Sequence, residues 1–365
     1  MNKIIFIDNQ NLELETKWDK FVASHPEGQI YFTTSWLKII QQESGEKLIR
    51  LACVDDKKNI LGVMPLVTTK GFPLGMGGVT AAARLSSLPR TPIGGPLSNS
   101  DEIDTLLLDE AIKLLKNFSG KILQVKSLSD KLNNSKEELA CIPWRESYIF
   151  EIPGDKNAEL RFGDSRNHSA IKRAVNKAAN NGVTIQITNS DSDLIAWYKL
   201  YLDTMRFHST PARSLKFFQA LWEKFHPSEN LKLYLAIHKD KIIAGSLLFY
   251  FNGYAIYAFN GSDRSTFELR PNDLIHWQAI SDAQQTGCHT YDFGEVSKNE
   301  TGLAAYKKKW GTKVIQIYHY YFPEQVSLYG NEIDIESVHG WKQKIIEKLP
   351  LNVSAIMGKW TYKYL

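Results

Sequence analysis

The chain has 365 residues, and at roughly 100 to 200 residues per domain this length predicts two domains. Its composition is 43% hydrophobic and 23% charged, which is ordinary for a globular chain and excludes disordered, collagen-like and disulfide-scaffold proteins. The formal net charge is +4, and the last 25 residues alone contribute +4, because they contain five lysines and one glutamate. The other 340 residues are formally neutral, which argues against a dedicated nucleic-acid binder.

The first half is predicted to combine helices and strands, from its hydrophobic periodicity, capping residues and turn residues. Strands are expected at 3–7, 48–54, 60–69, 122–125 and 148–152, and helices at 15–24, 35–44 and 102–118. The strands 48–54 and 60–69 form a predicted hairpin, followed by a Gly/Pro-rich loop at 71–96. We place a domain boundary at Pro153-Gly154-Asp155, so that residues 1–153 form the first domain and 154–325 the second.

The second half repeats this order of elements. Helices are expected at 165–181, 193–208, 214–225, 272–285 and 302–310, and strands at 231–238, 242–251, 254–260, 291–293 and 313–322. The Asn252-Gly253 pair interrupts the apolar run 242–259, and this pair favours a β-hairpin over a membrane span. The hairpins in the two halves are similar in pattern, which indicates a tandem duplication of one α/β unit; the alternative is chance similarity between amphipathic hairpins.

Several common site motifs are absent from the sequence. The glycines near Gly75 and Gly77 lack the G-x-G-x-x-G spacing, and no phosphate-binding G-x-x-x-x-G-K-[ST], H-E-x-x-H, Cys/His zinc pattern or G-x-S-x-G occurs. These absences argue against dinucleotide-dependent, P-loop, zinc-hydrolase and serine-hydrolase chemistry, and no metal site is expected.

Segments in the second half share their order with a known family. They are Arg173-Ala174-Val175-Asn176-Lys177-Ala178 closing in Gly182-Val183, the segment 205–211 ending in Thr210-Pro211, the segment 269–274, Tyr291-Asp292-Phe293-Gly294, and the segment 302–311. Together with 32–36, 62–66 and 94–97 in the first half, they resemble the FemA/FemB-type peptidoglycan bridge aminoacyltransferases and their relatives with the GNAT (general N-acetyltransferase) fold. The resemblance covers roughly residues 30 to 322.

This resemblance implies an α/β protein with two tandem GNAT-like domains. Each domain would be a mixed, mostly antiparallel sheet flanked by helices, and a basic helical tail at 326–365 would follow. The implied activity is N-acyl transfer to an amine of a cell-envelope or polysaccharide precursor, without a covalent enzyme intermediate. A non-catalytic ligand- or partner-binding protein is the rival hypothesis.

The resemblance leaves two acyl donors open, an acyl thioester such as acyl-CoA and an aminoacyl-tRNA. The [QR]-x-x-G-x-[GA] motif that holds coenzyme A in GNAT enzymes is missing between Asn260 and Asp273. No extended charged heptad region, as in the tRNA-contacting helical hairpin of some family members, occurs between 183 and 300. No resident cofactor is expected.

Four residues are candidates for catalysis. Lys307 matches the lysine of the family's Phe/Tyr-Lys pair and would neutralise developing negative charge; the alternative is a solvated Lys307-Lys308-Lys309 face. Tyr306 is its partner in that pair, or half-buried core. Asp292 and Glu295 are candidate acids or bases, with a turn-capping carboxylate as the alternative for Asp292.

Five further residues are candidates for substrate binding. Arg173 and Lys177 lie one helical turn apart and can converge on one phosphate; otherwise they form a solvent-facing charge ladder. His208, Asn260 and Arg270 are expected to line a cleft.

The C-terminal segment 341–365 alternates apolar and basic residues. Such a pattern suits contact with an anionic membrane surface, while packing against the protein is the alternative. The start of the sequence lacks the apolar core of a secretory signal. We therefore expect a cytoplasmic protein that contacts the inner face of the membrane peripherally, with a small-molecule or lipid-linked acceptor.

Overall fold

The computed structural model describes residues 2–8, 11–70, 83–118, 122–134 and 138–324, with Leu351 and Val353. The chain divides into two compact units. In the described ranges, the first unit comprises residues up to Arg145 together with the segment from Gln316 to 324, and the second extends from Glu146 to Ile315. No helix within these ranges is long and apolar enough to cross a membrane.

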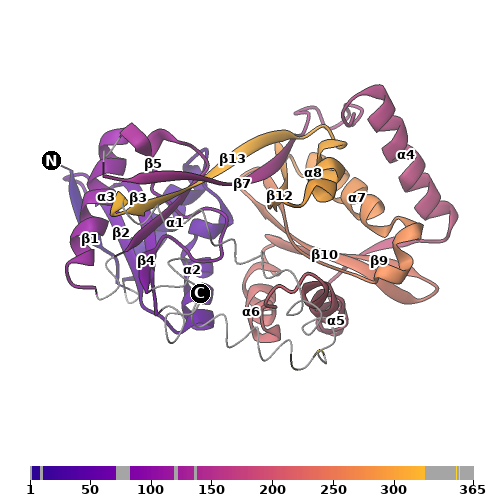
Figure 1. The fold of residues 1–365 in the computed structure, drawn as a ribbon, viewed down its shortest axis with the longest axis horizontal. Coiled ribbons are helices and arrows are strands. Elements are labelled where there is room, and N and C mark those ends of the chain that lie inside the picture. The colour runs from indigo at the N-terminus through magenta and orange to yellow at the C-terminus, as the bar shows by residue number, and fades with distance from the viewer. Residues whose placement is uncertain are drawn as a thin grey trace. The chain divides into compact units, whose positions relative to one another are not determined.

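The first unit is built on one mixed sheet (Figure 1). Its strands are β1 (Lys3–Phe6), β2 (Leu48–Val54), β3 (Ile60–Thr69), β4 (Arg84–Ser86), β5 (Leu97–Ser98), β6 (Leu123–Ser127), the start of β7 (Ala140–Glu151) and most of β13 (Lys313–Phe322). The sheet order is β1-β2-β3-β4-β6-β13, with β5 paired to β3. All these pairs are antiparallel except β4 and β6.

Alternation along β2 sends side chains to both faces of this sheet. Leu51 and Cys53 join an apolar cluster with helix α3 (Asp101–Leu115). On the other side, Arg50 donates to Glu15 of helix α1 (Leu12–Ser24) at 2.8 Å. Helix α2 (Thr34–Ser44) follows, and its Trp36 is fully buried. The sheet is therefore covered by helices on both faces.

The helices and strands of the second unit follow one another from α4 to α8. They are α4 (Ser165–Asn180), β8 (Thr184–Thr188), α5 (Asp191–Phe207), α6 (Leu215–Phe225), β9 (Leu231–His238), β10 (Lys241–Phe251), β11 (Tyr254–Ser262) and, after the short 3-10 helix η5 (Arg264–Leu269), α7 (Pro271–Gln285). Strand β12 (Thr290–Val296) and helix α8 (Thr301–Lys308) complete it. The sheet order is β7-β12-β11-β10-β9-β8, and β11–β12 is its parallel pair.

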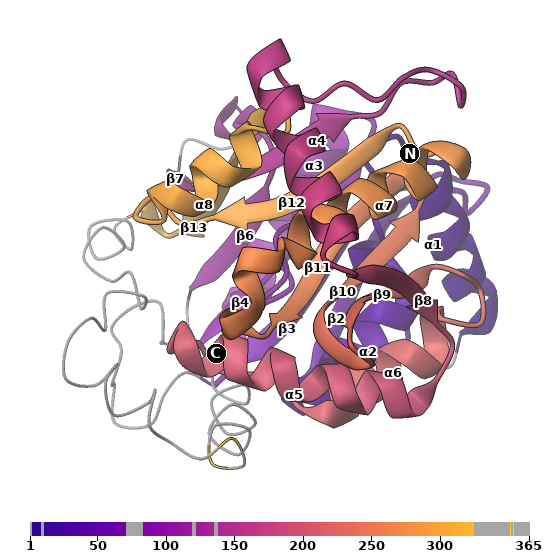
Figure 2. The same cartoon turned by 90° about the vertical axis from the view of Figure 1, so that its right-hand side faces the viewer.

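Helices cover both faces of this second sheet, with α4, α7 and α8 on one side and α5 and α6 on the other (Figure 2). On the α7 side, Tyr234 and Leu248 pack with Ile275 and Ala279. On the α5 side, the Trp197 indole donates to the carbonyl of Gly245 at 2.8 Å. This arrangement leaves the ends of β11 and β12 beside the starts of α7 and α8.

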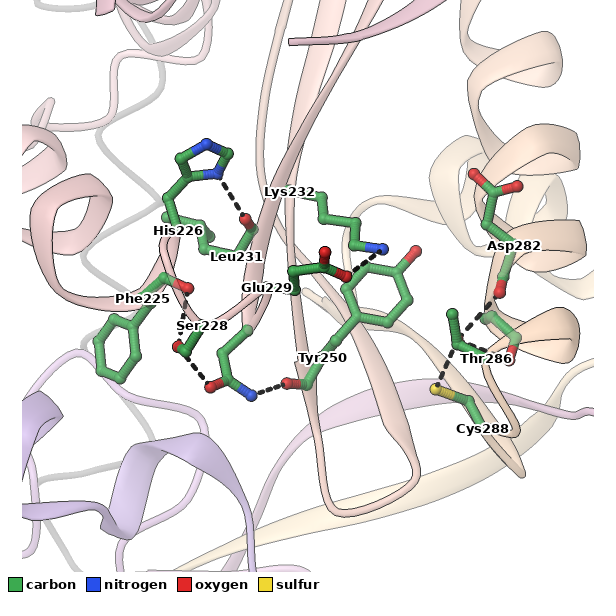
Figure 3. A network of polar contacts seen from close by, with 12 residues as sticks. Phe225, His226, Ser228, Glu229, Leu231, Lys232, Tyr250, Asp282, Thr286 and Cys288 are labelled. Atoms are coloured by element: carbon green, nitrogen blue, oxygen red, sulfur yellow. Dashed lines mark hydrogen bonds and ion pairs between the residues drawn. The ribbon is translucent and has the colours of Figure 1, made fainter. Parts of the chain in front are cut away.

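Polar contacts hold the turn between α6 and β9 to strand β10 (Figure 3). Ser228 donates to Asn230, whose side-chain amide donates to the Tyr250 carbonyl at 2.7 Å. Nearby, Cys288 is buried, and burial raises the pKa of its thiol. This part of the unit is a structural support for the sheet.

Apart from the two-residue strand β5 of the first unit, both units share the order strand, two helices, three strands, helix, strand. In each, the first three strand pairs are antiparallel and the next pair is parallel. Each sheet ends with a strand from the other half of the chain: residues of β13 pair with β6, and residues of β7 pair with β12. The division at 145/146 therefore differs from the predicted boundary near 153, and residues 316–324 belong to the first unit rather than the second.

Most predicted elements are present, including the hairpin of 48–54 and 60–69 and the hairpin around Asn252-Gly253. Asn252 and Gly253 both have a positive φ. Strands β4, β5 and β8 were not predicted. They are short, and β8 is mostly exposed and pairs with β9. The predicted tail 326–365 lies outside the described residues apart from Leu351 and Val353.

Candidate active site

Two parallel strands separate at the centre of the second unit. Tyr254–Ile256 of β11 pair with Thr290–Asp292 of β12, and the pairing of these two strands ends there although β11 continues to Ser262. A bulge between Asp292 and Glu295 contains Gly294, whose φ is +78°. A side chain at Gly294 would be strained at this angle. The bulge interrupts the register of β12 against β7 between these two residues.

Lys307 of α8 extends to this bulge. Its side chain is 5% exposed, and its ammonium donates to the carbonyls of Gly294 at 3.0 Å and Glu295 at 3.2 Å. Burial lowers the pKa of Lys307 to about 8, against the attraction of the nearby carboxylates of Asp292 and Glu295. Among the residues that the structure describes, no carboxylate bonds directly to this ammonium. A buried, hydrogen-bonded ammonium of this kind is a preorganised positive charge.

Asp292 holds the bulge in shape. Its Oδ1 accepts hydrogen bonds from the Gly294 amide at 2.7 Å and the Ser147 hydroxyl of β7 at 2.9 Å. Burial raises the pKa of this carboxyl group. Asp292 thus fixes the turn that carries one of the two carbonyls bound by Lys307. Glu295 is half-buried, and its side chain lies close enough to attract the Lys307 charge.

Tyr306 lies between α7 and the Lys309 side chain. The Lys309 ammonium is 4.5 Å from the Tyr306 ring centre and donates to Asp273 of α7 at 2.7 Å. Burial and the nearby Asp273 carboxylate raise the pKa of Tyr306 well above its usual range. The adjacent His276 accepts or donates a hydrogen bond with Tyr291 at 2.8 Å, and burial lowers the pKa of His276 to about 3. These contacts join the start of α7 to the end of α8.

A pocket of about 180 Å³ opens at the end of β11. Its lining includes two predicted residues, His208 after α5 and Asn260 on β11. It is completed by residues of α5, β11, η5 and α7, namely Thr204, Phe207, Ser262, Arg264, Phe267 and Asn272. The Tyr257 ring, three residues before Asn260, lies 4.6 Å from His276, whose ring is 5.9 Å from Tyr306. The pocket and the Lys307 region therefore flank one aromatic cluster.

The structure does not bring all the predicted residues together. Arg270 is exposed, has a left-handed φ of +60° and precedes the first turn of α7, outside the pocket lining. The positive charge of Arg270 lies close enough to Tyr306 to lower the pKa of its hydroxyl slightly, which opposes the larger raising effects of burial and of Asp273. Arg173 and Lys177 are exposed on α4, outside the lining of this pocket. Their substrate-binding role stays a prediction.

Three contributors were missed by sequence reasoning: Ser147, Asp273 and Lys309. Ser147 is on a strand from the preceding half of the sequence, so no local pattern marks it. Asp273 follows Pro271 in a helix-start pattern, a detectable signal for a carboxylate at a helix N-terminus. In the described ranges, no three His, Cys, Asp or Glu side chains gather in a way that would hold a metal ion.

Residues 165–308 match the family model for an acetyltransferase (GNAT) domain. This range contains β8 to β12 with their helices, including the separated strands β11 and β12 and the buried Lys307. The fold and the site define an acyltransferase of the GNAT fold.

Curated relatives narrow the class. The chain is 20% identical over 318 residues to the UDP-N-acetylmuramoylpentapeptide-lysine N(6)-alanyltransferase of Weissella viridescens, covering 80% of this chain and 86% of the relative. It is 31% identical over 85 residues to the lipid II:glycine glycyltransferase of Staphylococcus haemolyticus (strain JCSC1435), covering 21% and 20% of the two chains. The crystal structure of FemX has the same fold, with a TM-score of 0.68, 17% identity and coverage of 90% of this chain and 99% of that chain. The chain is therefore similar to FemA/FemB-type acyltransferases, and these matches support the resemblance that its motifs predicted.

Proposed function

We propose that this protein transfers an acyl group, most specifically an aminoacyl group, to an amine of a cell-envelope precursor. The buried Lys307 ammonium beside the β12 bulge is the observation that carries this proposal. The names of the relatives support the acceptor class, since one acts on a muramoylpentapeptide lysine and the other on lipid II.

The chemistry needs no covalent enzyme intermediate. The acceptor nitrogen attacks the donor carbonyl carbon and forms a C–N bond, and the carbonyl oxygen becomes a transient oxyanion. The oxyanion then collapses, the C–O or C–S bond to the donor breaks, and the leaving oxygen or sulfur takes up a proton. The nitrogen gives its proton to water or to a carboxylate, for which Glu295 and Asp292 are the candidates. Lys307 supplies positive charge for the oxyanion or the leaving group, and holding the reactants in line supplies much of the remaining acceleration.

The donor is an activated ester or thioester, so aminoacyl-tRNA and acyl-CoA both stay in the proposal. The helices between 183 and 300 are α5, α6 and α7, and all three pack on the sheet. In this part of the chain no helical arm extends from the fold to meet a tRNA body. If the donor is aminoacyl-tRNA, its 3′ end would account for most of the contact.

We also propose that the two units are tandem GNAT-like domains and that the second one carries the activity. The shared order of elements supports the duplication. The first turn of α3, which corresponds to α7 in this order, carries Asp101, Glu102 and Asp104. Three acidic side chains at that position disfavour the anionic groups of an activated donor. The first turn of α7 has only Asp273, which is paired with Lys309.

A cytoplasmic location with peripheral contact between segment 341–365 and the inner membrane face would suit a lipid-linked acceptor. This contact is tested with vesicles containing anionic lipid. We expect the full chain to bind them and a chain truncated after residue 340 to lose binding. Equal binding by both forms would assign those lysines to ordinary surface.

The proposed function is tested with purified full-length protein in a transfer assay. The donors are alanyl-tRNA, glycyl-tRNA and acetyl-CoA, and the acceptors are UDP-N-acetylmuramoylpentapeptide and lipid II. The expected result is product formation with at least one pair, at a rate that falls about 10²- to 10³-fold when Lys307 is changed to Met. Absence of turnover with every pair, together with tight binding of an acceptor, would favour a non-catalytic binding protein.

A further inference from the structure

Helix α4 carries the excess positive charge of the second unit. The 21 basic and 18 acidic residues between 146 and 315 give a formal charge of +3. α4 alone contributes +4, because it contains two arginines, two lysines and no acidic residue. The helix packs against α7 at one margin of the unit (Figure 1). The positive charge is therefore concentrated in one place on a nearly neutral body.

Three of these basic residues form a straight line, which we call the basic stripe. Arg166, Arg173 and Lys177 are all exposed, and with 3.6 residues per turn they lie within about 40° of one another around the helix axis. They extend over about 16 Å along that axis. The buried residues of α4 are Ile171 and Ala178, which point about 130° away from the stripe. The basic stripe is thus directed into solvent.

The charges of the basic stripe are not neutralised by neighbouring carboxylates. Among the residues that the structure describes, none forms an ion pair or hydrogen bond with its three side chains. The fourth basic residue of α4, Lys172, pairs with Glu159 at 3.2 Å, and that carboxylate also accepts from Arg161. Three clustered cations without counter-ions complement a surface of negative charge.

The other side chains of α4 favour a flat anionic surface. Ser169 and Ala170 separate the cations and are short, so a plane can meet all three charges at once. α4 exposes no large apolar side chain, so the contact would be with lipid headgroups rather than with acyl chains. The helix also has no Phe, Tyr or Trp to stack on bases, and the nearly neutral unit lacks the broad basic surface of a nucleic-acid binder.

We propose that the basic stripe of α4 docks the second unit on the anionic headgroups of a membrane. Near such a surface each lysine or arginine strengthens binding by roughly fivefold, so the three together supply about 100-fold. This contact is separate from segment 341–365 and goes beyond the transfer reaction. With the lipid-linked acceptor proposed above, it would hold the second unit at the bilayer that carries the acceptor.

The inference is tested by co-sedimentation of the full-length protein with vesicles made of equal parts of phosphatidylglycerol and phosphatidylcholine. In the parent protein the lysines of the C-terminal segment are changed to glutamine, so that they do not mask the stripe; they are Lys342, Lys344, Lys348, Lys359 and Lys363. The parent should bind, more weakly as salt rises, and should not bind vesicles of phosphatidylcholine alone. Adding Arg166→Gln, Arg173→Gln and Lys177→Gln should weaken binding about 100-fold.

The matched control removes the same charge from the other face of the sheet. It replaces three exposed lysines of α5 and α6 by glutamine, namely Lys199, Lys216 and Lys224. This variant should keep the affinity of the parent. Both triple variants should keep its melting temperature, because the replaced side chains are exposed.

Three results would overturn the inference. They are no vesicle binding by the parent, an equal loss in both triple variants, and vesicle binding that survives the α4 substitutions. If those substitutions instead abolished binding to a short RNA duplex, the stripe would be a nucleic-acid site. The assays contain no acyl donor or acceptor, so a failure here would leave the proposed transfer function intact.

Discussion

Replacing Lys307 by methionine separates a functional lysine from a solvated one. Methionine keeps the length and much of the volume of the side chain but removes the charge that is held at the Gly294 and Glu295 carbonyls. Loss of one preorganised donor to a developing oxyanion typically costs about 10²- to 10³-fold in rate. We expect a fall of that size in the transfer rate.

The same substitution should leave the protein folded. Burial lowers the pKa of Lys307 from 10.5 to about 8, which corresponds to a destabilisation of about 3 kcal/mol by the buried ammonium at neutral pH. Methionine removes that cost but leaves two carbonyl oxygens without their donor, at about 1–3 kcal/mol each. These effects oppose each other, so we expect the free energy of unfolding, measured in urea, to stay within about 3 kcal/mol of the wild type.

The pH dependence follows from the same pKa. Below about pH 8 the ammonium is charged, so transfer that depends on it should decline as pH rises through about 8. In the unfolded chain Lys307 keeps its proton up to about pH 10.5, whereas the folded protein loses it at about pH 8. The folded state therefore becomes more stable as the pH rises from about 8 to 10.5. Below about pH 8 the full cost of burying the ammonium is present. In Lys307→Arg, whose charge persists at high pH, any remaining activity should lack the decline.

The adjacent Lys308 provides the control, because it is on the same helix and exposed. Lys308→Met should keep the wild-type transfer rate and stability. The reasoning would be refuted if folded Lys307→Met retained more than a tenth of the transfer rate, or if the two variants lost activity equally. Assays are made with saturating donor and acceptor, so that the effect appears in kcat.

Three more predictions concern Asp292, Arg173 and Gly261. Asp292→Asn removes a negative charge that supports the Lys307 ammonium, so the decline in the pH–rate profile should move to lower pH; an unmoved decline would contradict this. Arg173→Ala should raise KM for a phosphate-bearing acceptor several-fold, and the increase should be larger at low salt. The melting temperature should not change, because the Arg173 side chain is exposed. An unchanged KM would assign Arg173 to the solvated face of α4. Gly261→Ala would place a methyl group 2.7 Å from the Leu200 carbonyl carbon and closer still to the Tyr201 amide. The free energy of unfolding in urea should therefore fall by about 1–3 kcal/mol. Unfolding at the wild-type free energy would show that α5 and β11 can move apart freely.

Local patterns in the sequence were sufficient for most helices and strands. Hydrophobic alternation located β2, β3, β9 and β10 closely, and Gly45 and the Asn252-Gly253 turn marked ends of elements, because these preferences depend on neighbouring residues. The order of several weak motifs was enough to predict the family.

Contacts between distant residues were beyond such patterns. The Lys307-Lys308-Lys309 run is consistent with an exposed helix face. Successive side chains on a helix point about 100° apart, however. Packing against the β12 bulge therefore buries Lys307 and leaves Lys308 in solvent. Ser147 reaches Asp292 because β7 crosses into the second sheet. Neighbours in sequence dictate an element's conformation, but burial and charge depend on partners brought close by folding, and these set the pKa of Lys307 and the shape of its site.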